Sequence, residues 1–393
     1  MYALDTRLTE SVRRYFDLCR EHADYITDHP ELGCEEHLAC GRYVKLLEEH
    51  GWQVETPVAG VPCSFRAVRK DRLDDAGPRA VLMCEYDALP EVGHGCGHSM
   101  SGSASLLAAL ALADAYPDLP LRIDLMGTPG EEYPGGKVML ADAGAFGGYE
   151  FAAMAHMMDY NAPGFGVLAC NDRYITFRGK AAHASAMPEK GINALNAARI
   201  FMDAMDMWRQ HLPKYSQIHG VVAKGGDLPS IVPDDVELNY YFRARTLKEL
   251  LDLNAKAEKC AEGAALCTGC TCECAQQYLT YADLSNPPAG LEALRDIFDA
   301  LDLPVREPGD PSGSTDAGNV DQIIPTFHPL VSVSGGRPQV VHDKGFTALM
   351  KCESGYRGLY NAAVLLASFA LRLAGEPERL AEIQRWHQEY RGL

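Results

Sequence analysis

The sequence is poor in positive charge and lacks a long uninterrupted run of apolar residues. Its 36 Lys and Arg residues are outnumbered by 54 Asp and Glu residues, which gives a formal net charge of -18. A chain this acidic repels phosphate backbones and anionic lipid headgroups, so the composition argues against nucleic acid and membranes as partners. The longest apolar run, Leu106 to Ala113, is too short to cross a bilayer.

The N-terminal residues also lack the pattern of an export signal. Asp5, Arg7 and Glu10 interrupt the segment where a secretory signal would need an unbroken apolar core. The 13 cysteines are therefore expected to be reduced thiols of a cytoplasmic protein and not a disulfide framework.

At 393 residues the chain exceeds the usual size of one domain, and its 47% hydrophobic residues suffice for large cores. Helical spacing of apolar residues runs from Leu8 to Ile26 and again from Leu38 to Leu47. Near-continuous apolar segments follow at Arg79–Cys84, Leu121–Met126 and Phe151–Ala155. Such segments are typical of strands buried on both faces of an α/β sheet.

The pattern changes at about residue 172. The segments that follow predict the order strand, helix, strand, strand, helix, strand, at Tyr174–Phe177, Ile192–His211, Ile218–Ala223, Val236–Phe242, Leu247–Leu266 and Thr271–Leu279. This order is that of the ferredoxin-like α+β unit. A breaker cluster at residues 286–290 ends it. We therefore predict a main domain of residues 1–171 and 286–393, interrupted by an inserted domain of residues 172–285.

Four closely spaced cysteines, Cys267, Cys270, Cys272 and Cys274, lie near the end of the predicted insert. A structural zinc or iron–sulfur site is conceivable there. Alternate spacing on a strand is also what small buried residues show, and we favour that interpretation.

A glycine-rich loop, Gly93–Ser99, is the first of three features that carry candidate chemistry. It follows the strand that ends at Cys84 and precedes a helical run from Met100 to Ala115. Its glycines allow a tight turn, so that Cys96 and His98 can face one metal ion. In isolation, however, a loop histidine is more often an exposed polar residue.

Adjacent carboxylates, Glu131 and Glu132, follow the strand of residues 121–126. Because neighbouring side chains project differently, one can bind metal while the other accepts a proton from water. A solvated acidic turn at the start of a helix would explain the pair equally well.

The third feature is His156, which follows the apolar segment Phe151–Ala155. A single histidine there is commonly satisfied by a hydrogen bond in the core. Yet the carboxyl ends of these strands would lie at one edge of the sheet. Three strand ends would thus bring together the sulfur of Cys96, the nitrogens of His98 and His156 and the oxygens of Glu132. This combination predicts a metal site.

Several motifs, taken in order, resemble those of the aminoacylase and carboxypeptidase G metallopeptidase family. They are EYDALP at 85–90, GHGCGH at 93–98, GTPGEE at 127–132, GGK at 135–137, AHASA at 182–186 and GSTDAGNV at 313–320. The likeness is greatest to amidohydrolases of the p-aminobenzoyl-glutamate hydrolase B type and to dipeptidases, and it extends from about His29 to the end of the chain.

This resemblance implies a metal-dependent amidohydrolase that cleaves an N-acyl or N-aroyl amino acid or a dipeptide. It implies two divalent metal ions, zinc or manganese, bound by Cys96, His98, Glu132, His156 and His342. Glu131 would then be the general base that takes a proton from the attacking water. The expected partner is a small-molecule amide substrate.

The insert resembles the lid and dimerisation domain of that family, which implies a homodimer formed through it. His183 matches a lid histidine that stabilises the oxyanion, often in the active site of the partner subunit. Arg243 matches a position that holds a substrate carboxylate, and Ser230 stands where many relatives have Asn beside that carboxylate. From the sequence alone, His183 would be a surface turn residue and Arg243 a solvent-facing strand residue.

Two other hypotheses remain open at this point. A cysteine-nucleophile amidase would use Cys96 with a nearby histidine as base, but it leaves the two adjacent glutamates without a role. A non-catalytic metal-binding relative would have no need of the base Glu131.

Overall fold

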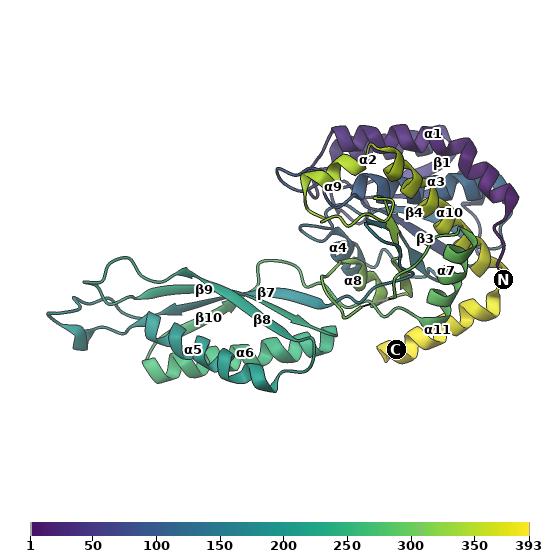
Figure 1. Ribbon diagram of the computed structural model, residues 1–393. Coiled ribbons are helices and arrows are strands. Elements are labelled where there is room, and N and C mark those ends of the chain that lie inside the picture. The colour runs from purple at the N-terminus through teal and green to yellow at the C-terminus, as the bar shows by residue number, and fades with distance from the viewer. Residues whose placement is uncertain (1, 308, 393) are drawn as a thin grey trace. The chain divides into compact units, whose positions relative to one another are not determined.

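In the computed structural model, which describes residues 2–307 and 309–392, the chain divides into two compact units (Figure 1). The first comprises residues 2–166, 284–310 and 315–392, apart from the residue not described. The second comprises residues 167–283 and 311–314. The α/β architecture with an inserted ferredoxin-like domain is confirmed, although the return of residues 311–314 to the second unit was not predicted.

The first unit is built on a mixed sheet with the strand order β1-β2-β4-β3-β5-β11. Its strands are β1 (Trp52–Glu55), β2 (Phe65–Arg69), β3 (Arg79–Cys84), β4 (Arg122–Gly127), β5 (Ala152–Ala153) and β11 (Thr326–Phe327). The central strands β3 and β4 run parallel, and both are almost wholly buried. Helices on both faces of the sheet explain why these strands are mostly apolar.

The predicted strand Phe151–Ala155 is shorter in the structure. It is reduced to β5, and the chain then enters β6 (His156–Met158), which pairs in parallel with β12 (Leu330–Ser332). The backbone N–H of His156 donates to Pro329 O at 2.9 Å. His156 is thus the first residue of this short ladder and is fixed by it.

Helices surround the sheet and supply much of the core. They are α1 (Thr6–Asp28), α2 (His37–Glu49), α3 (His98–Ala115), α4 (Gly136–Asp142), α7 (Pro288–Ala300), α8 (Ala317–Asp321), α9 (Lys344–Leu349), α10 (Glu353–Gly375) and α11 (Pro377–Arg391). A short 3-10 turn, η1, covers Lys70–Arg72. The helix α3 packs against α1, α10 and β3, and it is buried on nearly every side. Because α3 begins at His98, its burial fixes one candidate ligand in place.

Among the described residues, only α10 is long and apolar enough to cross a membrane by length and composition. Most of its apolar segment, 67%, is buried inside the protein, where it packs against α1, α3 and α7. The core helix of a soluble protein has the same properties, so this finding is weak evidence for a membrane span.

The second unit has the strand order β10-β7-β9-β8, with all pairs antiparallel. Its elements are β7 (Ala169–Arg178), η2 (Pro188–Lys190), α5 (Ala194–Trp208), η3 (Arg209–His211), β8 (Gln217–Lys224), β9 (Asp235–Ala244), α6 (Leu247–Thr268) and β10 (Thr271–Ala275). Helices α5 and α6 cover one face of this sheet (Figure 1). The predicted element order is confirmed, although β7 starts earlier and β10 ends earlier than the sequence pattern indicates.

Capping explains where the helices of this unit begin. The Asn193 side chain accepts hydrogen bonds from the backbone N–H groups of Leu195 and Asn196, so α5 starts at Ala194 and not at Ile192. Thr246 caps α6 in the same way through Glu249 N. Such caps satisfy N–H groups that have no partner within the helix.

Two neighbouring leucines of α6 test the core of the second unit. Leu250 is fully buried in the core formed by α5, α6 and β9, whereas Leu251 is 52% exposed. We expect Leu250→Ala to lower the free energy of unfolding by about 2–5 kcal/mol, because it removes buried methyl groups and leaves a cavity. Leu251→Ala should cost less than about 1 kcal/mol. Calorimetric unfolding of both variants tests this, and equal losses would contradict the assigned core.

Candidate metal centre

The loop between β3 and α3 brings Cys96 and His98 to the carboxyl end of the sheet. Gly97 has a φ of +81°, which favours glycine. A Cβ atom at Gly97 would lie only 2.7 Å from Cβ of Met157, and one at Gly95 would lie 3.3 Å from Cα of His342. These glycines therefore allow the loop to pack directly against the segments that carry the two other candidate histidines.

The structure brings all five predicted ligands, and the predicted base Glu131, into one cluster. Their ligand atoms form three overlapping groups, each with all atoms within 4.8 Å of one another. The groups are Cys96, His98 and His156; Cys96, Glu132 and His342; and His98, Glu131 and Glu132. Two ligands about 2.0–2.3 Å from a common ion lie at most about 4.6 Å apart. The separations of 3.3 Å between Cys96 and His156 and of 3.2 Å between Glu132 and His342 are within this limit and fit bound zinc or a similar ion.

Cys96 lies at the centre of the cluster. Its Sγ atom is 3.3 Å from Nε2 of His156 and 3.4 Å from Nε2 of His342. The Nε2 atom of His342 is also 3.2 Å from Oε1 of Glu132. His342 reaches this position from an exposed loop, and its backbone N–H donates to Gly95 O at 2.8 Å. In the sequence, His342 lies outside the quoted motifs and was assigned only through the family resemblance.

Asp87 holds two parts of the cluster in place, although it was not among the predicted site residues. Its Oδ1 atom is 2.9 Å from Nδ1 of His98, and its Oδ2 atom accepts from the backbone N–H of Glu132 at 2.9 Å. One carboxylate therefore orients an imidazole and also fixes the loop with the two glutamates. A carboxylate on the outer nitrogen of a metal-binding histidine is a common arrangement. The EYDALP motif at the end of β3 was the available signal.

A buried lysine also supports the cluster. Lys137 is fully buried, and its Nζ atom donates to Oε2 of Glu85 at 2.9 Å and to Oδ1 of Asp316 at 2.8 Å. The backbone N–H of Lys137 donates to the other oxygen of Asp316. The remaining oxygen of Glu85 is 3.6 Å from Nε2 of His98. The predicted motifs contain these residues, but their local spacing did not reveal that they pair.

The charge balance of this region favours bound cations. Buried carboxylates at and behind the cluster are Glu85, Asp87, Glu131 and Asp316. The buried cationic groups among them are the ammonium of Lys137 and the imidazole of His98, whose pKa, against the opposing effect of burial, is raised well above its usual range by Glu85 and Asp87. An uncompensated buried negative charge is costly, and divalent ions at the cluster would compensate it. The Nε2 atom of His98 is buried and has no hydrogen-bond partner among the described residues, so it is free to act as a ligand.

The protonation behaviour of the side chains differs across the cluster. Burial, together with the nearby charges of Asp316 and Glu132, raises the pKa of Glu131 well above its usual range. Burial lowers the pKa of His156 to about 4, which keeps this imidazole neutral, as a metal ligand requires. Bound cations would lower the pKa of Glu131 again, because they favour the carboxylate.

His328 was not predicted and lies behind His156. Its ring centroid is 5.7 Å from that of His156, and both of its ring nitrogens are buried without a hydrogen-bond partner among the described residues. Burial lowers the pKa of His328 to about 3, so the ring is neutral. No motif around His328 distinguishes it from an ordinary core histidine.

The other predicted residues lie in the second unit, where the structure brings two of them together. His183 is exposed and lies in a bridge opposite Ile231, and Ala184 N donates to Ser230 O at 2.9 Å. Strand β9 begins at Asp235, soon after Ser230 in the chain, whereas Arg243 lies near the other end of the strand. At the usual rise, these eight steps along the strand cover about 26 Å.

Arg243 is held by a hydroxyl group. Its Nη1 atom donates to Oγ of Ser314 at 2.8 Å, and that hydroxyl donates to Leu168 O at 2.7 Å. Ser314 belongs to the GSTDAGNV motif and precedes Asp316 by two residues. Both Arg243 and Ser314 lie in the second unit.

Three of the four closely spaced cysteines pack against the core of the second unit. Cys270, Cys272 and Cys274 are partly buried against the core of this unit, and Cys267 is exposed. None of the four belongs to a group of metal-compatible ligands in the described part of the chain. The structure therefore gives no support to a zinc or iron–sulfur site there.

Comparison with known proteins identifies the family. Residues 172–266 match a peptidase dimerisation domain. The chain is 34% identical to mouse Xaa-Arg dipeptidase over 96% of its own length and 90% of the relative. It is 30% identical to the B-type p-aminobenzoyl-glutamate hydrolase of Escherichia coli over 69% of its length and 59% of the relative.

Solved structures show the same fold. A proposed aminohydrolase from methicillin-resistant Staphylococcus aureus superposes with a TM-score of 0.81 at 20% identity, covering 94% of this chain and 99% of the other. A dinuclear metal-binding peptidase of the M20 family from Bacillus subtilis gives 0.69 at 18% identity, covering 92% and 99%. Given its identity to the dipeptidase over nearly the whole length, the chain belongs to the M20 family of metallopeptidases and is an enzyme that hydrolyses amide bonds.

Proposed function

We propose that the enzyme cleaves a dipeptide or an N-acyl or N-aroyl amino acid at a centre of two divalent ions, zinc or manganese. Cys96, His98, Glu132, His156 and His342 would hold the ions. The observation that carries this proposal is the convergence of their ligand atoms, which come from four separate parts of the chain. When bound, the ions would lower the pKa of a water molecule and polarise the scissile carbonyl group.

Glu131 is the proposed general base. Its Oε2 atom is 3.9 Å from Nε2 of His98, so it borders the ligands. The carboxylate of Glu131 accepts a proton from the attacking water and delivers it to the nitrogen of the leaving amine. Glu132, next to it, is held towards His342 and would act as a ligand.

The proposed substrate class is supported by the likeness to known dipeptidases and by Arg243, which could bind a substrate carboxylate. The names of the mouse and human relatives direct the first assays to dipeptides that end in arginine. In all candidate substrates the amine half carries a carboxylate, which suits a guanidinium group with Ser314 beside it. p-Aminobenzoyl-glutamate and N-acetyl amino acids complete the panel.

A homodimer through the inserted domain is part of the proposal. The edge strand β8 is exposed along almost its whole length, and Val221 and Val222 on it are 64% and 46% exposed. An apolar unpaired edge strand is a ready site for pairing with a second copy. A small substrate cannot contact both ends of β9, so His183 and Ser230 would serve the partner's site if Arg243 serves the chain's own.

A cysteine-nucleophile amidase has one observation in its favour, because two imidazole groups contact Cys96. Burial, however, raises the pKa of the Cys96 thiol far above its usual range, and a nucleophile must be a thiolate. A metal ligand loses this proton on binding the ion, so the metal-dependent reaction fits the site better.

The first test is Glu131→Gln in metal-loaded protein. We expect hydrolysis of a dipeptide ending in arginine to fall by roughly 10²–10⁴-fold, because the base is lost, while two ions per chain remain. Steady-state kinetics and elemental analysis of the same sample measure both quantities. Chelation should also abolish wild-type activity, and full activity in metal-stripped protein would rule the proposal out. Activity blocked by thiol alkylation in metal-free protein would favour the cysteine nucleophile.

Asp87→Asn tests how the ligands are positioned. We expect metal affinity to fall by roughly 10–100-fold, because the amide holds His98 and the Glu132 loop less firmly than the carboxylate does. Asp118→Asn is the matched control, since Asp118 is exposed and lies away from the cluster. Competition titration with a chromogenic chelator gives both affinities. Equal affinities in the two variants would show that Asp87 does not support the centre.

Mixing two inactive variants tests whether His183 acts in the partner's site. We expect Glu131→Gln and His183→Ala to be inactive alone, but their mixture to recover about a quarter of wild-type activity per chain, because half of the dimers would hold one complete site. The variants are mixed after reversible dissociation and assayed with the same dipeptide. If His183 serves its own chain, no mixed dimer has a complete site and no activity returns.

A further inference from the structure

A short segment between α1 and α2, Pro30–Glu36, packs against the two loops that carry most of the candidate metal centre. The carbonyl oxygen of Glu31 accepts from the backbone N–H of Ala88, in the loop after β3, at 2.8 Å. A Cβ atom at Gly33 would lie only 1.7 Å from Tyr133 O, in the loop after β4. The backbone of this segment is therefore in direct contact with both loops.

Glu36 ends the segment, but its side chain does not serve the helix that follows. It stands at the N-cap position of α2 and makes no hydrogen bond to that helix. The start of α2 is capped instead by Glu31, whose carboxylate accepts from Leu38 N and Ala39 N at 2.9 Å. Because an N-cap side chain commonly accepts from its own helix, the carboxyl group of Glu36 is left for another partner.

That partner is the backbone of Gly130, which immediately precedes the proposed base Glu131. Oε1 of Glu36 accepts from Gly130 N at 2.7 Å, across 94 positions of the sequence. Both residues are buried, so water does not replace this acceptor. Gly130 has a φ of +65°, and a Cβ atom on it would lie 2.9 Å from Tyr133 O. The hydrogen bond thus fixes a crowded turn of the backbone directly before Glu131.

A carboxyl group is costly at this place. Burial, together with the nearby charge of Asp87, raises the pKa of Glu36 to about 8. Oε2 of Glu36 is buried and has no hydrogen-bond partner among the described residues. An apolar side chain of similar size would avoid these costs, so the N–H group of Gly130 is the feature that calls for a polar side chain here. A carboxyl oxygen accepts this bond in either protonation state, as an amide oxygen also would.

We propose that Glu36 is a positioning residue for the general base and acts through the backbone of Gly130. Without this acceptor the buried N–H group loses its partner, and the turn shifts. A shift of about 1 Å at a reacting group can lower a rate by about 100-fold. The ligand Glu132 is held separately by Asp87, so turnover should suffer more than metal binding. The effect on turnover rests on the proposed function, whereas the effect on the turn does not.

Two variants of Glu36 in the metal-loaded full-length enzyme test this role. We expect Glu36→Leu, which has no acceptor, to lower kcat by roughly 10–100-fold with little change in KM, while two ions per chain remain. Glu36→Gln keeps an oxygen for Gly130 N and should stay within about threefold of the wild type. Glu35→Leu is the matched control, because the Glu35 side chain is exposed, and it should leave kcat unchanged. Steady-state kinetics and elemental analysis of the same samples give these quantities.

Combining Glu36→Leu with Glu131→Gln shows whether Glu36 acts through the base. We expect Glu36→Leu to lower the residual kcat by less than about twofold once Glu131 is replaced, because residues that act as one unit have effects that do not add. Hydrogen exchange of the peptide that contains Gly130, followed by mass spectrometry, needs no turnover. Exchange should be faster in Glu36→Leu than in the wild type, Glu36→Gln and Glu35→Leu.

Several results would overturn the proposal. They are an unchanged kcat or a loss of the ions in Glu36→Leu, an equal fall of kcat in Glu36→Gln, unchanged hydrogen exchange, and losses that add in the double variant. A lower melting temperature with unchanged kcat per metal-loaded chain would reduce Glu36 to a structural role. Glu36→Ala removes the same acceptor and replaces Glu36→Leu if that variant does not fold. Wild-type kcat in Glu131→Gln alone would contradict the proposed base and would leave the exchange result standing.

Discussion

An excess of buried negative charge at the carboxyl end of the main sheet is the constraint on which the catalytic unit depends. Glu85 and Asp87 follow β3, Glu131 follows β4, and Asp316 approaches from the C-terminal part of the chain. Lys137 neutralises part of this charge through two buried ion pairs. The remainder faces the imidazole and thiol groups of the cluster, so the ions would complete the electrostatic balance of the fold as well as its chemistry.

The loops at this edge of the sheet are closely packed. The loop at Gly97 approaches Met157 at a distance that leaves no room for a Cβ atom, and a Cβ atom at Gly33 would lie 1.7 Å from Tyr133 O. Glu36, nearby, accepts a hydrogen bond from Gly130 N at 2.7 Å. The loop with the two glutamates is therefore held from both sides, by Glu36 at its start and by Asp87 at Glu132. Such support gives a metal site its precision.

The sequence predicted the elements and the meeting of the candidate ligands better than it predicted the residues that support them. Strand β3 and the order of the inserted unit follow from apolar periodicity, which is a local property. The ligands could be grouped because the ends of parallel strands share an edge. The pairing of Lys137 with Asp316 joins residues 179 positions apart, and no periodicity encodes it. His328 was missed for the same reason, since only tertiary packing places it behind His156.

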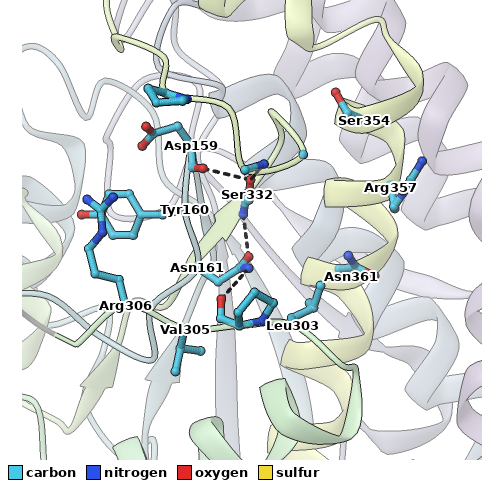
Figure 2. Close-up of a pocket in the computed structure, with 14 residues that line it drawn as sticks. Asp159, Tyr160, Asn161, Leu303, Val305, Arg306, Ser332, Ser354, Arg357 and Asn361 are labelled. Carbon is cyan, nitrogen blue, oxygen red and sulfur yellow. Dashed lines mark hydrogen bonds between the residues drawn. The ribbon is translucent and has the colours of Figure 1, made fainter.

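The short ladder of β6 and β12 connects the candidate metal centre with a second cavity of the same unit, which Asp159 and Ser332 line (Figure 2). His156 at its start is a proposed ligand, and Asp159, just past its end, lines the cavity. The strand β12 leads into the glycine-rich loop that ends at His342. Two of the five proposed ligands are thus attached to segments that also line the cavity. The loop of residues 335–342, which ends at one of these ligands, is exposed and held by few hydrogen bonds, so His342 has the least rigid support of the five.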